Sequence, residues 1–71
     1  MTREAKQELA KAYNGTVHLH EASYNNTSDT YLLTWRQAAE HACEDQDLVL
    51  IVYCMAVSGY SDFTDWAQQH D

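Results

Sequence analysis

Hydrophobic and polar positions at the start of the chain follow helical spacing. Ala5, Leu9 and Ala12 fall on one face, and Thr2 is a residue type that favours the N-cap position. Asn14-Gly15 is typical of a helix end, because glycine adopts the left-handed conformation at little cost. The pattern predicts a helix over residues 2–13.

The pattern changes to alternation after Gly15. Val17 and Leu19 point one way and His18 and His20 the other, which predicts a strand over residues 16–24. Turn-forming residues occupy 25–29 and are followed by a second apolar segment, residues 30–34. We interpret 16–34 as a β-hairpin. The alternative is one long helix that is capped by Ser28 and continues through Cys43.

The hairpin interpretation is favoured by a capping-box pattern, Thr34-x-x-Gln37, that directly precedes a second helical run. From Trp35 onward, one face of this run is lined by alanines: Ala38, Ala39 and Ala42. Glu40 and Glu44 lie four residues apart on another face. The acidic residues 44–47 are expected to end the helix in a solvated turn.

The most continuous apolar segment, residues 48–53, predicts a strand that is covered on both faces. Leu50→Asp is therefore expected to unfold the protein. Ser58-Gly59 breaks the segment, and Ser61 can cap a last helix whose apolar face holds Phe63, Trp66 and Ala67. The predicted order is α-β-β-α-β-α. We expect an α+β fold in which one compact domain, residues 1–71, packs helices on a sheet of about three strands.

The composition supports a folded, non-membrane protein. Although a chain of 71 residues buries only about 60% of its unfolded surface, 45% of the residues are apolar or aromatic. The longest apolar run, residues 48–57, is half the ~20 residues that a membrane span needs. No apolar signal segment follows Met1. We expect a cytoplasmic protein.

Charge is distributed unevenly along the chain. Residues 1–36 hold four acids and four bases, whereas residues 37–71 hold seven acids and no lysine or arginine, so the second half carries the whole net charge of −7. Phosphate binding is disfavoured by this sign, but attraction to basic, phosphate-binding protein surfaces is favoured. We predict an acidic partner-binding face formed by six residues: Glu40, Glu44, Asp45, Asp47, Asp62 and Asp65.

Two further points bear on that face. Tyr24, Tyr31 and Tyr60 would be contact anchors if they are exposed. The alternative interpretation of the acids is a solvated surface that only aids solubility. The absence of bases over residues 37–71 weakens this alternative, because ordinary surfaces mix both signs.

Metal and catalytic chemistry find little support in the pattern. His18 and His20 would share a strand face, and other possible ligands are His41, Cys43, Cys54 and His70, but these spacings are not those of a zinc motif. Gly15 and Gly59 serve turns and build no oxyanion or phosphate loop. We expect no catalytic residue, no cofactor and no metal, and hence no enzyme.

Three features of the chain taken together are its length, its predicted compact α/β organisation and its base-free acidic half, which runs from Gln37-Ala38-Ala39-Glu40 to His70-Asp71. In these features the chain resembles the small phage-encoded anti-CRISPR proteins, most of all those that act on type I-C systems. The resemblance spans the chain without a diagnostic motif. It implies an inhibitor, acting in the cytoplasm of an infected bacterium, whose acidic face mimics DNA. That face would occupy a basic surface of the Cascade surveillance complex where target DNA or its PAM binds.

The resemblance implies a protein subunit as partner, with no direct contact to nucleic acid or membrane, and we expect a monomer or weak homodimer. An alternative function is a small regulatory or adaptor protein, antitoxin-like, that binds a cognate protein through an apolar face. A third alternative is a small metalloprotein that uses His18, His20 and a cysteine. Salt separates the first two, because ionic mimicry weakens as ionic strength rises and apolar docking does not.

Overall fold

The computed structural model describes residues 2–25, 32–59 and 64. It contains three helices: α1 (Arg3–Asn25), α2 (Trp35–Ala42) and α3 (Gln46–Val57). No strand occurs in these described ranges. The prediction of an α+β fold with a three-stranded sheet is therefore wrong, and the described part of the chain is a small helical arrangement.

Helix α1 continues well beyond the predicted end at residue 13, and the strand predicted over 16–24 is wrong. The buried face of the helix holds Leu9, Tyr13 and Thr16, so the helical spacing persists across Asn14-Gly15. The prediction missed this continuation because it interpreted Asn14-Gly15 as a helix end. The hydroxyl of Thr16 donates a hydrogen bond to the carbonyl of Ala12 at 2.8 Å, which satisfies this polar group in a fully buried position.

Helix α2 begins where the capping box predicted. The backbone N–H of Gln37 donates to Thr34 Oγ1 at 3.1 Å, and the backbone N–H of Thr34 donates to Gln37 Oε1 at 2.9 Å. Thr34 has extended backbone angles, so the alternative of one helix from Ser28 through Cys43 is wrong. Of the three alanines that were predicted to line one face of this helix, Ala38 and Ala39 are fully buried and Ala42 is half-buried.

The second strand of the predicted hairpin does not form in the part of 30–34 that is described. Residues 32–34 lie in neither a helix nor a strand, and residues 30 and 31 fall outside the described ranges. Leu32 is exposed and Thr34 serves as the cap of α2. This segment leads into a helix instead of pairing with α1.

Helix α3 replaces the strand predicted over residues 48–53. Asp45 caps it, because one carboxylate oxygen, Oδ1, accepts from the N–H of Asp47 at 2.8 Å and of Leu48 at 3.3 Å. A continuous apolar run fits a buried strand or a buried helix equally well by periodicity. Its ten-residue length, from Leu48 to Val57, is more typical of a helix.

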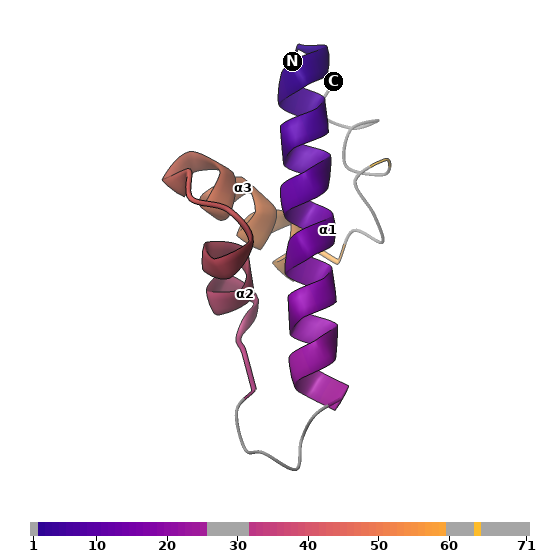
Figure 1. Ribbon diagram of the computed structural model, residues 1–71, viewed down its shortest axis with the longest axis vertical. Helices are drawn as coiled ribbons and strands as arrows, with labels where there is room; N and C mark the ends of the chain where they lie inside the picture. The colour runs from indigo at the N-terminus through magenta and orange to yellow at the C-terminus, as the bar shows by residue number, and fades with distance from the viewer. Residues whose placement is uncertain (1, 26–31, 60–63, 65–71) are drawn as a thin grey trace.

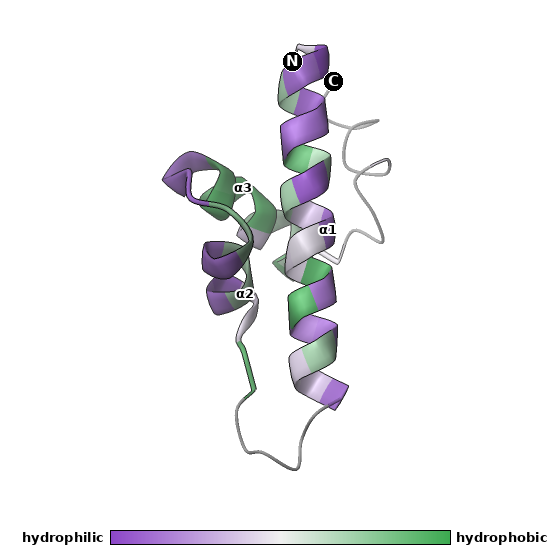
Figure 2. Cartoon of the chain, in the orientation of Figure 1, coloured by the Kyte–Doolittle hydropathy of each residue, from purple (hydrophilic) through white to green (hydrophobic). Residues whose placement is uncertain are grey.

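The three helices share one hydrophobic cluster, and each contacts the other two. Leu9 and Tyr13 of α1 meet Ala39 of α2 and Val52 and Met55 of α3 in this cluster. Figure 1 shows the long α1 standing beside the shorter α2 and α3. Figure 2 shows hydrophobic residues along α3 and hydrophilic residues at the turn that precedes it.

The last predicted helix, with Phe63, Trp66 and Ala67, lies outside the described residues. Among the helices that are described, none combines the length and the apolar character needed to cross a membrane.

Candidate functional site

Four of the six predicted acidic residues lie together on the surface. Glu40 is on α2, Glu44 and Asp45 are in the turn after it, and Asp47 is in the first turn of α3. All four are exposed. We call residues 40–47 the acidic segment. The other two predicted residues, Asp62 and Asp65, lie outside the described part of the chain.

The helical spacing predicted for Glu40 and Glu44 is wrong. Helix α2 ends at Ala42 and Cys43 has extended backbone angles, so Glu44 belongs to the turn. The N–H of Cys43 donates to the carbonyl of Ala39, which closes the helix before Glu44. The two carboxylates are therefore not held one helical turn apart on a common face.

Two carboxylates of the acidic segment have structural roles. Glu40 Oε1 lies 3.3 Å from Arg36 Nε in an exposed ion pair, and Asp45 caps α3. Exposed pairs of this kind contribute about 0–1 kcal/mol. The carboxylates of Glu44 and Asp47, by contrast, make no hydrogen bond or ion pair with any described residue. Within the acidic segment, these two carboxylates thus have no structural role among the described residues.

Folding also brings charges of the first half of the chain to the acidic segment. A surface depression of about 290 Å³ is lined by Glu44 and Asp45 together with Glu8 and Lys11 of α1. Glu8 enlarges the acidic surface, whereas Lys11 and the paired Arg36 partly neutralise it. Acidic and basic residues are therefore less separated on the folded surface than they are along the sequence. Sequence reasoning missed Glu8 because it treated α1 apart from the second half.

The cysteines and histidines do not assemble into a metal site in the described ranges. No group of three or more metal-ligating side chains comes together there. His18 and His20, predicted to share a strand face, instead lie about 200° apart around α1, because helical residues advance by about 100° each. His70 is outside the described residues.

The thiol of Cys43 is held in its protonated form. Burial raises the pKa of Cys43, and the nearby carboxylate of Asp45 raises that pKa further. In addition, the Cys43 Sγ donates a hydrogen bond to the carbonyl of Ala39 at 3.3 Å. Since the thiolate is the nucleophile and the metal ligand, this environment disfavours both roles for Cys43.

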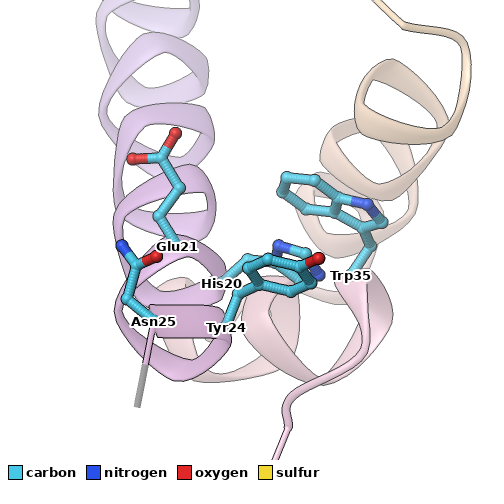
Figure 3. A pocket seen from close by; sticks show the side chains of 5 residues that line it. All are labelled: His20, Glu21, Tyr24, Asn25 and Trp35. Atoms are coloured by element: carbon cyan, nitrogen blue, oxygen red, sulfur yellow. The ribbon is translucent and has the colours of Figure 1, made fainter. Parts of the chain in front are cut away.

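A second group of side chains, which the sequence did not predict, lies at the C-terminal end of α1. We call His20, Tyr24 and Trp35 the aromatic cluster. The His20 and Trp35 rings are stacked with centroids 3.7 Å apart, and the centroids of His20 and Tyr24 are 6.5 Å apart at an interplanar angle of 19°. With Glu21 and Asn25 these rings line a cavity of about 380 Å³ (Figure 3).

The strand interpretation of residues 16–24 concealed this cluster. In a helix, His20 and Tyr24 are neighbours one turn apart, so the spacing alone would have paired them. Only the packing of α2 against α1 adds Trp35. Tyr24 is 63% exposed, which meets the condition under which it was predicted to anchor a contact; Tyr31 and Tyr60 lie outside the described residues.

No protein-family model, no curated protein and no solved structure matches the chain.

Proposed function

We propose that this chain is a non-catalytic inhibitor that binds the basic, DNA-binding surface of another protein through its acidic segment. The observation that carries the proposal is the pair of exposed carboxylates, Glu44 and Asp47, that no described residue engages. With Glu8, Glu40 and Asp45 they give five carboxylates against two bases, Lys11 and Arg36. An excess of this sign steers association toward surfaces built to hold phosphates.

The partner that we propose follows from the resemblance to small anti-CRISPR proteins in length and in the base-free acidic half; the α/β organisation that was the third feature of this resemblance is not found in the described residues. It is a subunit of a type I Cascade complex, of type I-C by that resemblance, and the acidic segment would stand in for the phosphates of target DNA at the PAM-binding surface. Contacts of this kind are ionic and surface-exposed. They should therefore be screened by salt, since the Debye length falls from about 10 Å at 0.1 M to about 3 Å at 1 M.

The proposal is tested by capturing purified type I-C Cascade on the tagged, full-length chain. Capture should occur at low salt, decline progressively with added NaCl, and coincide with loss of target-DNA binding by the complex. Capture without loss of DNA binding would contradict mimicry. Absence of capture at low salt would contradict the choice of partner.

A pair of single substitutions tests the assignment of the surface. Glu44→Lys reverses a carboxylate that has no described structural role, whereas Glu4→Lys makes the same charge change in the first turn of α1. Glu44→Lys should weaken capture by roughly tenfold, and Glu4→Lys should change it far less. Equal effects would show that net charge, not this surface, drives binding. Circular dichroism checks that both variants fold.

One observation favours the alternative, an adaptor that binds a protein through an apolar face. Leu50 and Val57 of α3 are 56% and 61% exposed, and Cys54 between them is exposed as well. These positions are four and three residues apart, so they share a face of the helix. If this face makes the main contact, capture of Cascade should persist at high salt. The double variant Leu50→Ser/Val57→Ser should then lose capture, whereas Glu44→Lys should retain it.

A further inference from the structure

The cavity beside the aromatic cluster has no part in the acidic segment or in the proposed function. Its five lining residues come from the last turns of α1 and the first residue of α2: His20, Glu21, Tyr24, Asn25 and Trp35. At about 380 Å³ it is within the range of volumes that small-ligand sites occupy. Figure 3 shows the three rings gathered between the two helices, whereas the side chains of Glu21 and Asn25 extend from α1 on the side away from Trp35.

The geometry of the rings leaves aromatic surface open to a ligand. The centroids of His20 and Trp35 are 3.7 Å apart in a direct stack, whereas those of His20 and Tyr24 are 6.5 Å apart in an offset stack, so the Tyr24 ring is only partly covered by His20. Tyr24 is 63% exposed at the end of α1, so much of its ring surface is open to a ligand.

The polar lining decides the charge of the ligand. Glu21 is the only charged side chain among the five lining residues, and the Asn25 side chain adds an amide acceptor. Aromatic faces attract cations, and a planar guanidinium also stacks on them and pairs with a carboxylate. We propose that this cavity binds a guanidinium group, with its plane on the Tyr24 ring and its N–H groups toward Glu21.

The described part of the chain already holds one guanidinium group between an aromatic ring and a carboxylate. The guanidinium carbon of Arg36 lies 5.9 Å from the centroid of the Tyr53 ring, while Nε of the same side chain pairs with Glu40 at 3.3 Å. An aromatic face and a carboxylate thus hold a guanidinium at the surface of α2 and α3. The cavity offers the same two elements, Tyr24 and Glu21, without a base among its lining residues.

A nucleobase, which also stacks on aromatic rings, fits this cavity less well. Nucleotides carry phosphates, and phosphate binding depends on lysine and arginine. None of the five lining residues is a lysine or arginine, and Glu21 would repel a phosphate. The lining therefore selects a planar cation over a planar anion.

The test is an NMR titration of the full chain with three probes: Nα-acetyl-L-arginine amide, free L-arginine and Nα-acetyl-L-lysine amide. Saturable shifts of the Tyr24 and Trp35 ring resonances with an arginine probe, at dissociation constants on the order of millimolar, support the proposal. Preference for the blocked arginine indicates an arginine within a peptide, whereas preference for L-arginine indicates a free metabolite. Absence of saturable shifts, or equal shifts with the lysine probe, would overturn it.

Matched variants separate a binding role of these residues from a structural one. Tyr24→Phe keeps the ring and should retain binding, whereas Tyr24→Leu keeps the apolar bulk and should weaken it roughly two- to fivefold. Glu21→Gln should weaken binding and reduce its salt dependence, while Glu4→Gln, with the same charge change at the other end of α1, should do neither. Unchanged affinity in both Tyr24→Leu and Glu21→Gln would contradict the assignment.

This inference does not depend on the proposed function, because the probes are small molecules and no Cascade complex is present. Binding of the arginine probe with no capture of Cascade would retain the cavity and remove the inhibitor proposal. Capture of Cascade without binding of any probe would do the reverse.

Discussion

Neighbouring apolar side chains of α3 differ sharply in burial. Val52 is 0% exposed and belongs to the hydrophobic cluster, whereas Leu50, two residues earlier, is 56% exposed. Residues two apart on a helix point in nearly opposite directions, since each residue advances by about 100°. The importance of an apolar residue for folding is therefore set by its place around α3 and not by its hydrophobicity.

This difference corrects the expectation that Leu50→Asp unfolds the protein. Leu50→Asp should change the free energy of unfolding by about 1 kcal/mol or less, because its carboxylate stays in water. Val52→Asp should unfold the chain, because the desolvation of a buried charge exceeds the roughly 5 kcal/mol of stability that a domain of this size has. Thermal unfolding followed by circular dichroism checks both. Equal losses would contradict the burial pattern of α3.

At the scale of elements, the helices depend on local caps and on one another to different degrees. Helix α2 has only eight residues, and a helix this short is not stable alone in water. Its first turn is held by the two reciprocal hydrogen bonds between Thr34 and Gln37. Helix α1, with 23 residues, is far less dependent on its first turn.

The cap of α2 should therefore contribute measurably to stability. Thr34→Ala removes the acceptor for the N–H of Gln37 and should lower the free energy of unfolding by about 1 kcal/mol, while Thr34→Ser should restore most of it. Thr2→Ala is the matched control, because Thr2 Oγ1 accepts from the N–H of Ala5 at the free end of α1. Urea unfolding midpoints give the comparison. An equal shift for Thr2→Ala would show that α2 is not the more cap-dependent helix.

At the scale of the whole molecule, the packing of α1 against α2 relies on a small residue. A Cβ atom placed on Gly15 would lie 3.4 Å from the Cβ of Ala42, which is ordinary van der Waals contact. Gly15 lies within α1 and does not have a left-handed backbone conformation. Among the described residues, the glycine with a left-handed conformation is Gly59, which has a φ of 80° and lies just after α3. The role of Gly15 is thus close approach between helices and not termination of one.

Two substitutions at Gly15 test this packing. Gly15→Ala should raise the free energy of unfolding by about 0.5–1 kcal/mol, because alanine favours the helix and its methyl group fits against Ala42. Gly15→Leu should lower it by about 1–3 kcal/mol, because the longer side chain forces the helices apart. Chemical unfolding of both variants provides the measurement. Stabilisation by leucine as well would show that α1 and α2 are not in close contact there.

Local chemistry made several features predictable. The capping box of Thr34 and Gln37 and the exposure of the acidic turn are confirmed. Each depends on residues within one helical turn, or on charge that favours water over a protein interior. Such features are encoded by neighbours in the chain and need no knowledge of the rest of the fold.

The sequence by itself determined where α2 begins and which residues carry the net charge. It also indicated that the apolar run 48–57 contributes to the core, but only one side of the run does so: Val49, Val52 and Met55 are buried, whereas Leu50, Cys54 and Val57 are exposed. Whether that apolar run became a strand or a helix was decided by tertiary structure, because a continuous run has no period and its partners choose its conformation. The same packing placed Lys11 and Glu44 along one surface depression and stacked Trp35 on His20. Those contacts join residues that are far apart in sequence, and only the arrangement of α1 against α2 brings them together.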